Sequence, residues 1–242
     1  MEKKSIEKLW EIIELALGDD FVHGMPHIKN VHKNFELFKK DYSKEEIDEK
    51  FINLLEYAVI LHDIGRPLGF KNHGFAGVKF LMTFFSEDLS SIKKEDLIYV
   101  YHAIEHHCKG LKEEKKTAKT NKDKCLGLLV LFDHMDAIGK RGILRAIKSK
   151  SSEIPFLPKE NENISRIKKL LEAYNKDEEI DEMKYKEMKE SSIIEHLTYN
   201  LCVTFNIQNK VEYLLRSKIK KEIQKRLKFM EEYIRINLEL LD

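Results

Sequence analysis

Apolar residues recur along most of the chain with the three- and four-residue spacing of amphipathic helices. Ile6, Leu9, Ile13 and Leu17 form one such stripe, which we interpret as a face turned toward the core. No segment shows a convincing β-strand alternation of apolar and polar residues. The pattern predicts helices over residues 4–17, 27–38, 43–62, 72–86, 94–108 and 123–148, and three or four more within residues 163–242.

The helix predicted over residues 43–62 carries start and stop signals. Ser43 and Glu46 form the Ser-x-x-Glu pattern of a capping box. The last turns, LEYAVILHD, are largely apolar, so this end of the helix is predicted to be buried. Gly65 and Pro67 are expected to end the helix.

The predicted domain organisation depends on a proline-containing connection at residues 149–162, which holds two of the four prolines. This connection separates a helical core, residues 1–148, from C-terminal helices, residues 163–242, that we expect to pack on it in one compact domain. Phe156 and Leu157 are apolar residues in an otherwise polar loop. Two interpretations stay open: an anchor, which is favoured, and a lid over the base or sugar of a small substrate.

Composition narrows the class of protein. The chain has 242 residues, 42% of them hydrophobic, which is enough for a substantial core. Charged residues make up 35%, yet the formal net charge is +1, without the basic excess of a typical nucleic-acid binder. The three cysteines are far apart, which indicates neither a disulfide framework nor a zinc knuckle. The N-terminus is typical of an amphipathic helix and no apolar run is long enough for a bilayer, so we predict a cytoplasmic protein without a membrane partner.

Histidines and aspartates gather near predicted helix ends, and nine of the ten histidines precede residue 135. His62 and Asp63 follow an apolar run, where an unpaired buried charge would cost about 3–5 kcal/mol and a bound cation would remove that cost. A histidine at a helix C-terminus beside a solvated aspartate is the alternative. His27 opens a helix, and Asp133 lies in a second apolar run. Such nitrogen and oxygen ligands suit Mn²⁺, Fe²⁺, Co²⁺, Ni²⁺ or Zn²⁺ better than Ca²⁺. Three other histidines are interpreted as ordinary polar or packed residues: His23, His32 and His196.

Together these motifs resemble the HD-domain superfamily of metal-dependent phosphohydrolases. They read HGMPHIKNVHKNF, YAVILHDIGRP with an intact HDIG tetrad, NHGFAGVKFL, AIEHHCKG and LFDHMDAIGKRGILR, between residues 23 and 145. The resemblance implies an all-α fold, an HD-domain helical bundle with additional C-terminal helices. It also implies hydrolysis of a nucleotide or other small phosphate ester by a metal-activated water, with manganese among the candidate metals.

The resemblance also implies roles for individual residues. One metal ion is expected and a second is possible. Arg66 matches a basic position that contacts phosphate, although a surface arginine at a helix end is an equal alternative. The implied metal ligands are His27, His62, Asp63 and Asp133; the implied catalytic or substrate-binding residues are Arg66, His73, His106 and His107; the possible phosphate contacts are Lys140 and Arg145.

Two other functions remain open at the level of sequence. A nuclease or cyclic-nucleotide phosphodiesterase can use the same metal site, but a single-stranded path needs a basic groove with aromatic residues. The polar run KEEKKTAKTNKDK could supply charge, but it contains no aromatic residue. The second alternative is a non-catalytic protein that uses the HD fold to bind a ligand, and the complete ligand set argues against it. A small phosphorylated molecule is therefore the expected partner.

Overall fold

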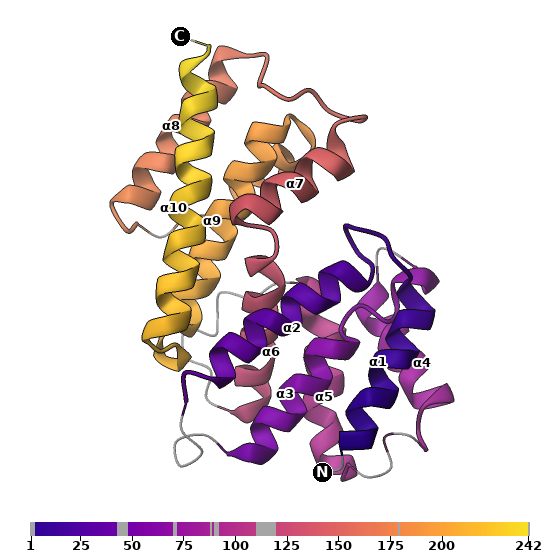
Figure 1. The fold of residues 1–242 in the computed structure, drawn as a ribbon. Coiled ribbons are helices and arrows are strands. Elements are labelled where there is room, and N and C mark those ends of the chain that lie inside the picture. Colours follow the sequence, from indigo (N-terminus) through magenta and orange to yellow (C-terminus); the bar gives the residue numbers. More distant parts are fainter. Residues whose placement is uncertain are drawn as a thin grey trace. The chain divides into compact units, whose positions relative to one another are not determined.

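A computed structural model describes residues 3–42, 48–69, 72–87, 89, 92–109, 120–178 and 180–241. This part of the chain is helical and contains no strand, so the predicted all-α class is confirmed. Backbone contacts divide the chain into two compact units (Figure 1). The first comprises residues 1–132 with 210–219, and the second comprises residues 133–209 with 220–242.

The first unit is a helical bundle around α3. Helix α3 packs against α1, α2 and α5, while α4 packs against α5. Its buried residues run almost without interruption from Phe51 to Leu61, which confirms the predicted buried end. The helices of this unit are α1 (Lys3–Leu17), α2 (Met25–Lys39), α3 (Glu49–Leu61), α4 (His73–Phe84), α5 (Lys94–His106) and most of α6 (Asn121–Met135), with the 3-10 turns η1 (Arg66–Leu68), η2 (His107–Lys109) and η4 (Glu212–Leu214).

Helix starts follow local capping rules. Helix α3 begins after Asp48, whose carboxylate accepts a hydrogen bond from the backbone N–H of Lys50. The predicted capping box of Ser43 and Glu46 lies outside the described residues. Helix α2 starts with Pro26 in its first turn, the position that suits a residue without a backbone N–H.

The prediction of a single helix over residues 123–148 is wrong. Helix α6 ends at Met135, and α7 (Gly139–Lys150) begins after a short turn. Gly139 adopts a left-handed φ of +69°, and a Cβ on Gly142 would lie 2.2 Å from the carbonyl oxygen of Ala137. Buried apolar residues, including Met135 and Ile138, continue through this turn, so the periodicity did not reveal the break.

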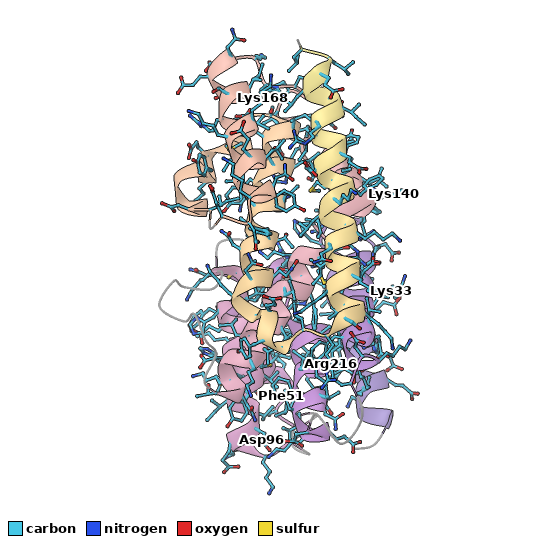
Figure 2. All side chains as sticks on the ribbon, turned by 90° about the vertical axis from the view of Figure 1, so that its left-hand side faces the viewer. Lys33, Phe51, Asp96, Lys140, Lys168 and Arg216 are labelled. Carbon is cyan, nitrogen blue, oxygen red and sulfur yellow. The ribbon has the colours of Figure 1, made fainter. Side chains whose placement is uncertain are left out.

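The second unit contains α7, α8 (Asn161–Asn175), most of α9 (Ile193–Val211) and most of α10 (Ser217–Glu239), with η3 (Glu182–Glu190). Exposed lysines such as Lys140 and Lys168 project from it (Figure 2). Inside, apolar side chains of several helices are buried, among them Ile167, Leu197 and Leu227. None of the helices in the described part of the chain combines the length and hydrophobicity of a membrane span.

The boundaries of these units differ from those predicted at residues 148 and 162. The chain passes between units at residues 132, 209 and 219, each time inside a helix: α6, α9 and α10 respectively. No glycine, proline or polar loop is needed at such a crossing, so composition does not mark it.

Candidate metal centre

His62 and Asp63 lie at the buried end of α3. Helix α3 ends at Leu61, and both following side chains are 0% exposed. The chain turns back at once, because the N–H groups of Ile64 and Arg66 donate to the carbonyls of Leu61 and Asp63. The apolar run therefore delivers an imidazole and a carboxylate into the interior of the first unit.

Glycines bring α4 against this turn. A Cβ on Gly65 would lie 2.0 Å from the carbonyl oxygen of His73, and one on Gly74 would lie 2.5 Å from the carbonyl oxygen of Ile104. Only residues without side chains permit these two approaches. The glycine of the HDIG tetrad thus allows the start of α4 to carry His73 to Asp63.

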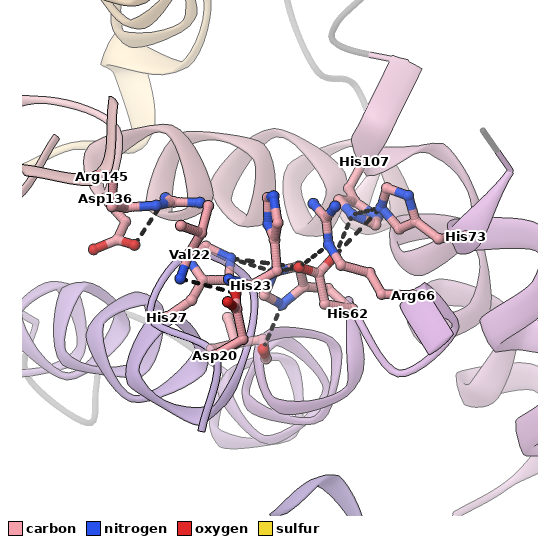
Figure 3. Close-up of polar contacts among 12 residues, drawn as sticks. Asp20, Val22, His23, His27, His62, Arg66, His73, His107, Asp136 and Arg145 are labelled. Carbon is pink, nitrogen blue, oxygen red and sulfur yellow. Dashed lines mark hydrogen bonds and ion pairs between the residues drawn. The ribbon is translucent and has the colours of Figure 1, made fainter. Parts of the chain in front are cut away.

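The two carboxylate oxygens of Asp63 face different pairs of histidines. Figure 3 shows the four rings, those of His27, His62, His73 and His107. Oδ2 lies 3.6 Å from Nε2 of His27 and 3.8 Å from Nε2 of His62. Oδ1 lies 3.2 Å from Nε2 of His73 and 3.4 Å from Nε2 of His107. Within each pair the Nε2 atoms approach closely, at 3.2 Å for His27 and His62 and at 3.0 Å for His73 and His107.

Backbone carbonyls orient two of these rings. Nδ1 of His62 lies 2.8 Å from the carbonyl oxygen of Val59, and Nδ1 of His107 lies 2.7 Å from that of Ile104. A carbonyl only accepts, so Nδ1 carries the proton in each neutral ring and Nε2 keeps its lone pair. Each ring therefore directs a metal-binding nitrogen toward Asp63, as the histidines of metal sites commonly do.

The electrostatics around Asp63 favour an ionised carboxylate. Burial raises its pKa, but the His62, His107 and His73 rings and the Arg66 guanidinium outweigh burial and hold the pKa well below its usual range. Its buried Oδ1 atom has no contact of hydrogen-bond geometry among the described residues. An ionised carboxylate oxygen between two imidazole nitrogens has the chemistry of a metal ligand.

Arg66 is held beside the centre. Its Nε atom donates to Oδ2 of Asp63 at 2.5 Å, and its side chain is 18% exposed. Within the described residues this is the only hydrogen bond of the Arg66 side chain, and its terminal nitrogens make none there. Arg66 thus keeps donors for an anionic ligand.

Asp133 and His106 were also predicted to belong to the site. Asp133 is half-buried in the last turn of α6, one residue after Phe132. The Phe132 carbonyl accepts a hydrogen bond of 2.9 Å from the side chain of Asn34, which ties this turn of α6 to α2. His106 packs its ring on His102, with the ring centroids 4.5 Å apart.

The predicted phosphate contacts on α7 have protein partners of their own. Nη1 of Arg145 donates to Asp136 at 2.8 Å, and Nε of Arg141 donates to the other oxygen of the same buried carboxylate at 2.5 Å. Lys140 is exposed, with Nζ 5.6 Å from the ring centroid of Phe229. The sequence analysis did not identify Arg141 as a second partner of Asp136. The i, i+4 spacing of Arg141 and Arg145, which places both on one helix face, was a signal for it.

The donor set fits divalent transition metals. Two groups of three buried residues each place their ligand atoms within 4.8 Å of one another: His27, His62 and Asp63, and Asp63, His73 and His107. Mixed imidazole and carboxylate ligands suit Mn²⁺, Fe²⁺, Co²⁺, Ni²⁺ and Zn²⁺. These buried groups can therefore hold a metal ion.

Fold and site together define a class, the all-helical proteins with a buried histidine and aspartate cluster that can hold a metal ion. The family model of the HD domain matches residues 26–138, which include every candidate ligand. Residues 26–138 of this chain thus match the HD domain, whose superfamily consists mostly of metal-dependent hydrolases, and the predicted resemblance is confirmed for this part of the chain.

Similarity of fold extends beyond the HD domain. A structural genomics target from Lactobacillus plantarum, known from its crystal structure, superimposes with a TM-score of 0.59 at 16% identity. The likeness covers 100% of this chain and 98% of that one. At this identity it concerns the fold alone. A comparison with curated proteins finds no match.

Proposed function

We propose that this protein is a metal-dependent phosphohydrolase in which two residue groups that share Asp63 would each hold a divalent ion. The observation that carries the proposal is the contact of each Asp63 oxygen with a different histidine pair, all four Nε2 atoms lying within 3.8 Å. The sequence alone favoured one ion, with His73 and His107 contacting substrate. Their approach to 3.2 and 3.4 Å supports a ligand role instead.

Asp133 is proposed as a further ligand beside His27 and His62. The support comes from the continuity of α6, which runs unbroken from Asn121 to Met135. The turn just before Asp133 is bonded to Asn34, on the helix that also carries His27.

A bound divalent ion supplies a nucleophilic water at neutral pH and neutralises charge on phosphoryl oxygens. The residues of this chain orient that chemistry. Asp63 fixes Arg66 through Nε, which leaves two terminal nitrogens able to hold a phosphate bidentately. Roles for His106, Lys140 and Arg145 in substrate binding stay predictions.

The proposed substrate is a nucleotide or another small phosphate ester. Support comes from burial, since the side chains of His27, His62 and Asp63 are 0% exposed. A centre enclosed in this way suits a small molecule better than a polymer. The formal net charge of +1 agrees with this choice.

A hydrolysis panel tests the proposal. Metal-free protein, with and without Mn²⁺, is assayed against nucleoside mono-, di- and triphosphates, a generic phosphodiester, cyclic nucleotides and single-stranded oligonucleotides. We expect Mn²⁺-dependent hydrolysis of small nucleotides, absent in Asp63→Ala and normal in the exposed-site control Lys33→Ala. Metal binding without hydrolysis of any substrate would identify a ligand-binding protein instead, and preferential cleavage of strands would identify a nuclease.

A further inference from the structure

A second group of potential metal ligands lies on the same helix pair, outside the Asp63 centre. We propose that His32, Glu36 and Glu56 form an independent site for a divalent transition-metal ion. Each residue offers one ligand atom, and the three atoms lie within 4.8 Å of one another. His32 and Glu36 share one face of α2 at i, i+4 spacing, and Glu56 comes from α3, which packs against α2.

The cluster already gathers around a positive charge. Nε2 of His32 lies 3.0 Å from Oε1 of Glu56. Nζ of Lys39 lies 3.6 Å from the other oxygen of Glu56 and 3.7 Å from Glu36. The Lys39 side chain is 43% exposed, whereas that of Glu56 is 8% exposed. The lysine can therefore move into solvent and leave the two carboxylates and the imidazole to a divalent ion.

The ligands are suited to binding at neutral pH. Burial raises the pKa of Glu56, but His32 and Lys39 outweigh burial and hold the pKa below its usual range, so the carboxylate is ionised. The His32 ring packs edge-on against Trp10, with the centroids 5.1 Å apart, and this contact restricts its orientation. One imidazole and two carboxylates suit Zn²⁺, Mn²⁺ or Co²⁺, with water in the remaining positions.

This site is distinct from the Asp63 centre. On α2, His32 follows His27 by five residues, which is about 140° around the helix and about 7.5 Å along it. On α3, Glu56 precedes His62 by six residues, about 120° around the helix axis. The two sets of ligands are therefore displaced from each other along α2, and they share no residue.

An ion at this site would connect α2 to α3. These helices carry His27 and lead into His62 and Asp63. Because only the folded chain brings the three ligands together, the ion stabilises the folded state by mass action. The role we infer is structural support of the helices that position the centre.

Titration of metal-free protein with Co²⁺ or Zn²⁺, followed by absorption and calorimetry, tests this inference. We expect wild type to bind one more equivalent of metal ion than Glu36→Gln does. The rate of phosphate-ester hydrolysis should be the same in both proteins. Lys39→Met keeps the apolar stem but removes the competing charge. It should bind the additional ion on the order of tenfold more tightly.

Equal stoichiometry in wild type and Glu36→Gln would overturn the inference, as would unchanged affinity in Lys39→Met. Either result would make the cluster an ion-pair network only. Unfolding curves measured without metal establish that Glu36→Gln and Lys39→Met both fold. The additional equivalent does not depend on hydrolysis, so failure of this site and failure of the proposed function give separate results.

Discussion

At the scale of single residues, the centre depends on where helices end. His62 and His107 each occupy the first position after a helix, and each donates its Nδ1 proton to the carbonyl three residues earlier. The sequence identified His62 and Asp63 as candidates because they follow an apolar run, and the family resemblance added His73 and His107. It did not identify these carbonyls, because backbone groups carry no signature. His32 was interpreted as an ordinary polar histidine, because its partner Glu56 is near it only after folding.

Substitution of Asp63 by asparagine keeps the shape of the side chain and removes its charge. Asparagine keeps one neutral oxygen and replaces the other with an amide nitrogen, so the histidine pairs no longer share an anionic carboxylate. We therefore expect loss of bound metal and at least about a 100-fold lower rate of hydrolysis. Elemental analysis and a nucleotide assay on the same preparation measure this, with Lys33→Ala as the control. A variant that keeps both its metal and its rate would exclude Asp63 as a ligand.

His196 predicts a pH dependence of stability. Burial lowers its pKa from an ordinary value of 6.5, outweighing the hydrogen bond to the Lys189 carbonyl, which raises it. The unfolded chain therefore binds a proton more readily than the folded chain, and stability is lost as pH falls below 6.5. Relative to His196→Gln, wild type should lose unfolding free energy between about pH 8 and about pH 5.5 in denaturant titrations. If the difference in unfolding free energy between wild type and His196→Gln were the same at both pH values, this account would be contradicted.

At the scale of secondary-structure elements, periodicity located helices but not every break. The turn between α6 and α7 escaped prediction because buried apolar residues continue through it. The packing of α4 on the turn after α3 escaped as well. It depends on contacts of Gly65 with residues that are neighbours only in the folded chain, such as Gly77.

Gly65→Ala tests that packing. The added Cβ would lie 2.0 Å from the carbonyl of His73, so α4 must shift. We expect a loss of about 1–3 kcal/mol in unfolding free energy and weaker metal binding on the His73 side. Gly77→Ala is the milder matched variant, since its nearest contacts are at 3.2 Å, and its effects should be smaller. Equal stability of Gly65→Ala and wild type would refute this explanation of the HDIG glycine.

Phe156 distinguishes a lid from an anchor. The backbone of residues 155 and 156 is fixed to the start of α9, because Pro155 and Phe156 accept hydrogen bonds from Ile193 and Ile194. The Phe156 ring itself is 38% exposed. Because Phe156 is partly exposed, we expect Phe156→Ala to melt at nearly the same temperature and to keep its metal. A raised KM for a nucleotide in this variant would identify a lid. A normal KM with early melting would identify the ring as an anchor.

At the scale of the whole molecule, class and family were accessible from sequence and the division into units was not. The HDIG tetrad and the other implied metal ligands fall within residues 26–138, where the family model matches. The C-terminal helices carry no such motif, yet the likeness to the Lactobacillus plantarum protein spans the full chain. Unit boundaries inside continuous helices follow from tertiary contacts alone.

Metal should contribute to global stability, because the histidine pairs meet only in the folded chain. At a free metal concentration 100 times the dissociation constant, one bound ion adds about 2.7 kcal/mol to the unfolding free energy. Thermal unfolding with Mn²⁺ and with chelator measures the difference. It should shrink sharply in Asp63→Asn, and a difference of the same size in that variant would place the stabilising metal elsewhere.

The most direct test is a titration of hydrolytic rate against bound Mn²⁺. It uses metal-free Glu36→Gln protein, which lacks the further site, and a nucleotide substrate. We predict no hydrolysis without metal and a rate that reaches its plateau when two ions are bound per chain. Hydrolysis in the presence of chelator, or a fully loaded protein that hydrolyses no phosphate ester, would contradict the assignment of Asp63 and its four histidines as a metal-dependent phosphohydrolase centre.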